Sequence, residues 1–145
     1  MMQYDRMTLG KQAKELGFVR DTFEKVCRLT NILQFLSNDS YVAGKVALKG
    51  GTAINLTMMN MPRLSVDIDL DYIGSISKNQ MLVEKEEIRK IINRYMIANG
   101  YQLSSKSKNY HALDSLVYDY VNSGGVKDNL KIEINYMLRC HILEV

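Results

Sequence analysis

Three aspartates at alternate positions, Asp67, Asp69 and Asp71, have the spacing that most directly suggests chemistry. Side chains of an extended strand alternate between its two faces, so we expect the three carboxylates on one face and the apolar residues between them on the other. Carboxylates in such a row repel one another, and divalent cations would turn that repulsion into binding, because hard cations prefer carboxylate oxygen. The spacing predicts a metal site at Asp67 and Asp69. For Asp71 two roles stay open: a ligand of this metal site, or an ion pair with a lysine or arginine at the rim of the site.

A glycine pair upstream of the acidic strand, Gly50 and Gly51, precedes a predicted short helix that begins at Thr52. Glycine lets the backbone pass close to a ligand, and the first turn of a helix offers unpaired N–H groups and a partial positive charge to phosphate. We therefore predict that Gly50, Gly51 and Thr52 hold the β- and γ-phosphates of a nucleoside triphosphate. Further candidates for the triphosphate are Lys49, Arg63, Ser65 and Lys131, and for Arg63 a structural pair with an aspartate is an equal alternative.

A third carboxylate stands in the predicted strand 130–138, where Leu130, Ile132, Ile134 and Tyr136 alternate with polar residues. If this strand lies beside the acidic strand, Glu133 can face Asp67 and Asp69 as a third metal ligand. The alternative is a surface glutamate paired with Lys131.

These groups would suit nucleotidyl transfer, in which a triphosphate is held, its charge is neutralised and an acceptor hydroxyl attacks the α-phosphorus. Two cations bridged by carboxylates can do most of this, so no Ser–His or Cys–His arrangement is required. Nothing near His111 or His141 resembles such an arrangement, and a structural hydrogen bond is the expected role of His111. The expected cofactor is Mg²⁺ or Mn²⁺, and the expected substrate is an NTP.

The elements that would position these residues form an α+β fold, a mixed β-sheet of about four to five strands packed against helices. Hydrophobic periodicity predicts two long helices, 21–37, opened by an Asp21–Glu24 capping box, and 78–99, closed by Gly100. A shorter helix is expected over 11–18, after a frayed start, and strands over 42–48, 65–73, 101–105, 113–121 and 130–138. The charged helix residues Lys25, Arg28, Glu84 and Lys85 are expected to face solvent.

Length and composition set broad limits on function. A chain of 145 residues, 46% hydrophobic and 24% charged, is expected to form one domain. Its net charge of +3 allows contact with nucleic acid without requiring it. The sequence has no apolar run long enough for a membrane span and no signal-peptide pattern, and its two widely separated cysteines fit a reduced cytoplasm.

The segment from Lys49 to Leu70, with GG-T, P-R-L-S and D-I-D-L in order, closely resembles the AbiEii/AbiGii-type nucleotidyltransferase toxins of the DNA polymerase β-like superfamily. The segments 18–29, 110–115 and 127–136 resemble the same family, so the likeness extends from about residue 16 to 141. The resemblance implies a polymerase β-like fold. It matches Gly51 and Thr52 to nucleotide binding, Asp67 and Asp69 to the metal pair, and Glu133 to the third acidic position.

The resemblance also implies transfer of a nucleotide from an NTP to an acceptor such as a tRNA 3′ end. It implies the toxin of a type IV toxin–antitoxin pair tied to abortive phage infection, with a winged-helix DNA-binding antitoxin encoded nearby. Family members of this kind continue into a helical half, so residues 1–145 are expected to be the N-terminal part of a longer protein or a minimal form. Two alternatives stay open: a non-catalytic nucleotide- or partner-binding module, and a minimal transferase that modifies a protein.

Overall fold

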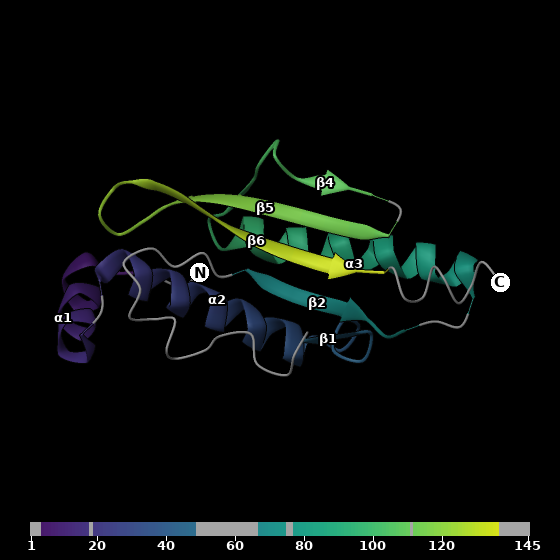
Figure 1. Cartoon of the computed structure of the whole chain (residues 1–145), viewed down its shortest axis with the longest axis horizontal. Helices are drawn as coiled ribbons and strands as arrows, with labels where there is room; N and C mark the ends of the chain where they lie inside the picture. The colour runs from purple at the N-terminus through teal and green to yellow at the C-terminus, as the bar shows by residue number, and fades with distance from the viewer. Residues whose placement is uncertain (1–3, 18, 49–66, 75–76, 111, 137–145) are drawn as a thin grey trace.

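A computed structural model describes residues 4–17, 19–48, 67–74, 77–110 and 112–136 (Figure 1). Within these ranges the chain forms three helices and six strands, which agrees with the predicted α+β class. The helices are α1 (Arg6–Leu16), α2 (Arg20–Asn38) and α3 (Lys78–Ala98). The strands are β1 (Val46–Leu48), β2 (Ile68–Tyr72), β3 (Gln102–Leu103), β4 (Lys108–Asn109), β5 (Leu113–Val121) and β6 (Lys127–Asn135).

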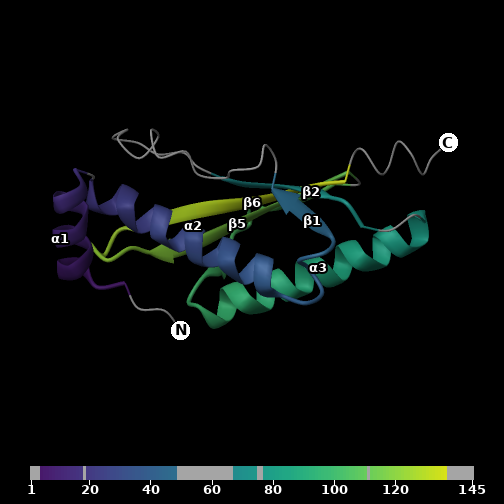
Figure 2. The ribbon, with the colours of Figure 1, turned by 90° about the horizontal axis from the view of Figure 1, so that it is seen from below.

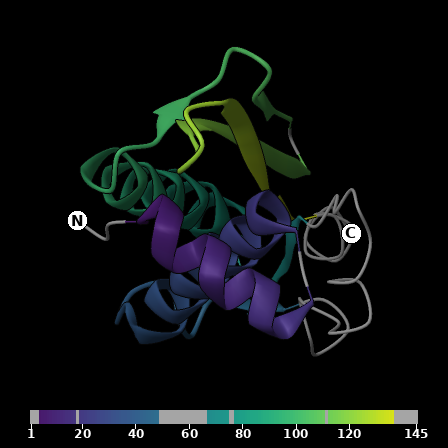
Figure 3. The ribbon, with the colours of Figure 1, turned by 90° about the vertical axis from the view of Figure 1, so that its left-hand side faces the viewer.

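The strands form one mixed sheet in the order β1-β2-β6-β5-β3, and β4 also pairs with β5. β2 and β6 are parallel, whereas the other pairs are antiparallel. Parallel neighbours need a long connection, and here it includes α3 and the strands β3 to β5. The helices α2 and α3 lie against one face of the sheet (Figures 2 and 3).

The core lies between this face and the helices, and its sheet residues follow the predicted alternation. Ile68, Leu70 and Tyr72 of β2 are buried. So are Leu130, Ile132 and Ile134 of β6 and the following Tyr136. Because these side chains point toward the helices, the residues between them on each strand point away from the helices. That outer face carries Asp69 and Asp71 of β2 and Glu133 of β6.

Local hydrogen bonds move several element boundaries from their predicted places. α1 begins at Arg6, because the Asp5 carboxylate accepts the backbone N–H of Thr8 at 2.9 Å. β1 is shorter than expected, because the Asp39 side chain accepts from the backbone N–H groups of Tyr41 and Val42 and holds a turn there. The loop expected between β3 and β5 contains the short strand β4.

The predicted Asp21–Glu24 capping box is wrong. α2 begins one residue earlier, after Val19, and Val19 makes no side-chain cap hydrogen bond. Glu24 is fully buried instead, where its carboxylate accepts from Arg28 Nε at 2.8 Å and from the backbone N–H of Ser123 at 2.8 Å. The carboxylate therefore joins α2 to the β5–β6 turn.

Three charged helix residues expected in solvent are buried. The Arg28 guanidinium stacks between the rings of Tyr4 and Tyr120, 4.1 Å from each ring centre. On α3, Glu84 accepts a hydrogen bond of 2.6 Å from the Tyr72 hydroxyl, and Lys85 donates to the carbonyl oxygen of Tyr110. Each of these side chains contacts a residue outside its own helix, and helical periodicity does not report such contacts.

Candidate active site

The pairing of β2 with β6 brings the candidate carboxylates onto one face. In this parallel register Asp69 is opposite Glu133, and Asp71 is opposite Asn135. Residues opposite each other in a sheet share a face, and the neighbouring pair Ile68 and Ile132 is buried against the helices. Asp69 and Glu133 therefore lie on the outer face. The condition set for Glu133, that its strand lies beside the acidic strand, is met.

Lys131 joins two of these carboxylates. Its ammonium nitrogen lies 3.0 Å from Oε1 of Glu133 and 3.7 Å from Oδ2 of Asp67. The hydrogen bond to Glu133 is the largest cause of a raised pKa at Lys131, and the negative charge of Asp67 acts in the same direction, so the ammonium stays charged. The Glu133–Lys131 pair expected as an alternative is therefore present, and it extends to Asp67.

The side chains around this ammonium are partly accessible to solvent. About a third of each is exposed, 36% for Asp67, 30% for Glu133 and 35% for Lys131, and Asp69 is exposed as well. A ligand that approaches the outer face can thus reach the carboxylates.

The donor chemistry of this face fits a hard divalent cation, because its side chains offer the carboxylate oxygens that such cations prefer. In the part of the chain that the structure describes, no three acidic, histidine or cysteine side chains converge on a single metal position. A cation does lie between Asp67 and Glu133, and it is the ammonium of Lys131. The metal role of Asp67, Asp69 and Glu133 stays a prediction that these donors suit in kind.

The predicted phosphate cradle lies outside the described residues. Gly50, Gly51, Thr52, Arg63 and Ser65 all fall there, as do Lys49 and His111. The structure does describe Leu48, the last residue of β1, which pairs with Leu70 between Asp69 and Asp71. The chain therefore leaves β1 toward the glycine pair from a position next to the acidic strand.

Two polar residues that the sequence did not single out share the outer face. Ser115 of β5 is opposite Glu133, so that Asp69, Glu133 and Ser115 form one row across three strands. Asn135 is opposite Asp71 in the next row. A single strand shows only which residues alternate. Alternation along its strand already puts Asn135 on the face of Glu133. Its position opposite Asp71, and that of Ser115 opposite Glu133, depend on the register between strands, which no local signal reports.

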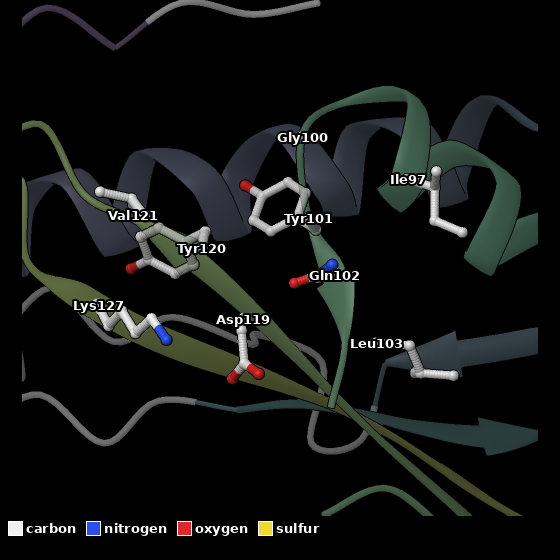
Figure 4. A pocket seen from close by; sticks show the side chains of 9 residues that line it. All are labelled: Ile97, Gly100, Tyr101, Gln102, Leu103, Asp119, Tyr120, Val121 and Lys127. Carbon is white, nitrogen blue, oxygen red and sulfur yellow. The ribbon is translucent and has the colours of Figure 1, made fainter. Parts of the chain in front are cut away.

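A separate pocket of about 540 Å³ lies between the end of α3 and the strands β3, β5 and β6 (Figure 4). The rings of Tyr101 and Tyr120 form part of its wall, and Asp119 and Lys127 supply polar groups. None of the predicted site residues lines it, and Asp119 is the one carboxylate among its lining residues. This pocket therefore offers a single carboxylate, whereas Asp69 and Glu133 lie together on the outer face.

Among the described helices none is long and apolar enough to cross a membrane.

Comparison with known families agrees with the resemblance. The family described as "Nucleotidyl transferase AbiEii toxin, Type IV TA system" matches residues 34–143. This match begins within α2 and includes Asp67, Asp69, Lys131 and Glu133. No curated protein and no solved structure matches the chain at a significant level. Because the family match covers most of its length, the chain belongs to the AbiEii family, the nucleotidyltransferase toxins of type IV toxin–antitoxin systems.

Proposed function

We propose that this toxin transfers a nucleotide from an NTP to an acceptor such as a tRNA 3′ end, with Mg²⁺ or Mn²⁺ held by Asp67, Asp69 and Glu133. The observation that supports this most is the parallel pairing of β2 with β6, which sets Asp69 opposite Glu133 on the outer face. Asp67, immediately before β2, and Glu133 both contact the ammonium of Lys131. Residues more than sixty positions apart in the sequence thus supply one acidic face.

The family assignment implies an NTP substrate and an antitoxin partner. In our proposal the backbone at Gly50 and Gly51 and the hydroxyl of Thr52 hold the β- and γ-phosphates. Arg63, Ser65 and Lys131 add contacts to the triphosphate. The antitoxin is proposed to carry a winged-helix DNA-binding domain and to be encoded nearby.

The divalent cations and the carboxylates of the acidic face would have different tasks. Divalent cations, when bound, would neutralise charge on the triphosphate and would lower the pKa of the attacking hydroxyl. Asp69 and Glu133 hold their carboxylates in one row, because both side chains project from paired positions of the sheet. The rigid pairing fixes this spacing before substrate arrives, which is how a positioned site lowers the barrier of a transfer reaction.

The test is calorimetric titration of the chain with each NTP in the presence of Mg²⁺, followed by assays with tRNA as acceptor. Asp69→Asn is the informative variant, because it removes one carboxylate from the row and leaves the contacts of Lys131 with Asp67 and Glu133 in place. We expect this substitution to abolish metal-dependent NTP binding and to remove labelled-nucleotide transfer.

Asp119→Asn is the matched control, since it also removes one carboxylate from the sheet. Asp119 is four positions along β5 from Ser115, hence about 13 Å from the row of Glu133 at ~3.3 Å per residue. Equal NTP binding by the wild type and Asp69→Asn would refute the assigned metal site. Labelled nucleotide on a protein rather than on RNA would replace the tRNA acceptor with a protein. Binding without transfer would favour the non-catalytic module.

A further inference from the structure

Lys131 places a positive charge between two of the proposed metal ligands. Its ammonium lies 3.0 Å from Glu133 of β6 and 3.7 Å from Asp67, which immediately precedes β2. It therefore balances negative charge that would otherwise repel across the β2–β6 pair. A divalent cation bound to the same oxygens would play the same electrostatic part.

The two cations cannot share this position. Mg²⁺ approaches its oxygen ligands to about 2.1 Å, which is closer than either contact of the ammonium. A metal ion at that distance from Glu133 would lie within a few ångströms of the ammonium, where two positive charges repel strongly. One of the two has to move when the other binds.

We propose that Lys131 is a built-in counter-ion, which occupies the metal position before metal binds and moves to the triphosphate once the cation takes Asp67 and Glu133. This inference rests on the proposed function, because it assumes the same metal ligands. In this inference Lys131 competes with the metal ion for the same carboxylates. A lysine that only binds the triphosphate would not compete in this way.

The surroundings of Lys131 suit an exchange of this kind. Its side chain is 35% exposed, and an ion pair so accessible to water is weak enough for a divalent cation to displace. Lys85 offers the contrast within the same chain. Its side chain is 7% exposed, lies 3.7 Å from Asp114 and donates to a backbone carbonyl, so it is held permanently. Exposure and flexible reach separate the exchangeable lysine from the structural one.

The experiment measures Mn²⁺ binding to the nucleotide-free chain by titration calorimetry and by electron paramagnetic resonance. Lys131→Met keeps the length of the side chain and removes its charge. We expect Mn²⁺ to bind this variant roughly three- to tenfold more tightly than the wild type, the size expected when a partly exposed charge is removed. The NTP affinity measured with saturating Mn²⁺ should fall, because the triphosphate loses a contact.

Two matched variants isolate the cause. Lys131→Arg keeps the charge and should not bind Mn²⁺ more tightly. Lys127→Met lowers the net charge equally but lies four positions away on β6, about 13 Å at ~3.3 Å per residue, which exceeds the screening length of about 8 Å. It should bind Mn²⁺ like the wild type. Circular dichroism checks folding, and Lys131→Gln serves as a second neutral variant.

The outcomes separate this inference from the proposed function. If Asp69→Asn abolishes Mn²⁺ binding while the wild type and both neutral Lys131 variants bind equally, the competition is refuted and the metal site stands. If Lys127→Met tightens binding as much as Lys131→Met, net charge is responsible and the inference fails. If neither the wild type nor any Lys131 variant binds Mn²⁺, the metal site and the inference fail together.

Discussion

Replacing Arg28 by methionine should destabilise the fold strongly, because it leaves a buried carboxylate without its cation. Glu24 is 0% exposed and accepts from Arg28 Nε at 2.8 Å. Arg28 also donates to the Tyr101 hydroxyl at 3.0 Å and stacks against the rings of Tyr4 and Tyr120. The substitution keeps an apolar stem of similar length and removes the ion pair, the hydrogen bond and the planar group.

Removing one partner of a buried ion pair costs about 3–5 kcal/mol. A loss of 1 kcal/mol lowers the melting temperature of a chain near this size by roughly 3 °C, so Arg28→Met should lower it by about 10 °C or more. Lys25 on the same helix provides the control. Its ion pair with Asp128, 3.0 Å long, joins side chains that are 16% and 28% exposed. Lys25→Met should therefore cost less than about 1 kcal/mol.

Urea denaturation followed by circular dichroism gives both free energies of unfolding. The double variant Arg28→Met with Glu24→Gln should recover part of the loss, because the amide keeps an acceptor for Ser123 and carries no charge. Equal and small losses for Arg28→Met and Lys25→Met would refute the reasoning. They would mean that water reaches Glu24 and that α2 and the β5–β6 turn are not joined through a buried charge.

Two further predictions concern a tyrosine and a glycine. Burial raises the pKa of Tyr101 to about 12 from 10.0, so its contribution to stability is complete below pH 10 and is lost as the pH rises through about 12. The free energy of unfolding should fall over that range and fall less in Tyr101→Phe, and parallel curves from urea denaturation at each pH would contradict this. Gly17 closes α1 with φ 80°, so Gly17→Ala should cost about 1 kcal/mol. An unchanged melting temperature would show that α1 ends without this cap.

Much of the secondary structure was predictable, because its signals are local. The alternation of apolar and polar residues around Ile68–Tyr72 and Leu130–Tyr136 predicts which side chains are buried, and the structure confirms it. The periodicity of 21–37 and 78–99 predicts helices within one residue of the observed bounds of α2 and α3. The start of α1 and the length of β1 were missed, since both depend on single side-chain hydrogen bonds from Asp5 and Asp39.

The acidic residues of the candidate site were also chosen from the sequence, but their grouping was conditional. Asp67 and Asp69 follow from their spacing, whereas Glu133 depends on which strand lies beside β2 and in what register. Pairing between distant strands is set by the packing of the whole sheet on its helices, so only the tertiary structure places Asp69 opposite Glu133 and Lys131 between Glu133 and Asp67.

The sequence by itself therefore predicted the family, the types of secondary-structure element and the candidate metal-binding carboxylates, because local patterns and motifs indicate each of them. Tertiary structure decided which charges are buried. The Arg28 side chain donates a hydrogen bond to the Tyr101 hydroxyl, 73 positions away, and the Glu24 carboxylate accepts one from the backbone N–H of Ser123, 99 positions away. A helix presents a charged side chain to whatever packs against it. Periodicity shows which face of the helix a charged side chain lies on but not which distant residue packs against that face. In this chain the charged side chains of that kind contact buried partners rather than water.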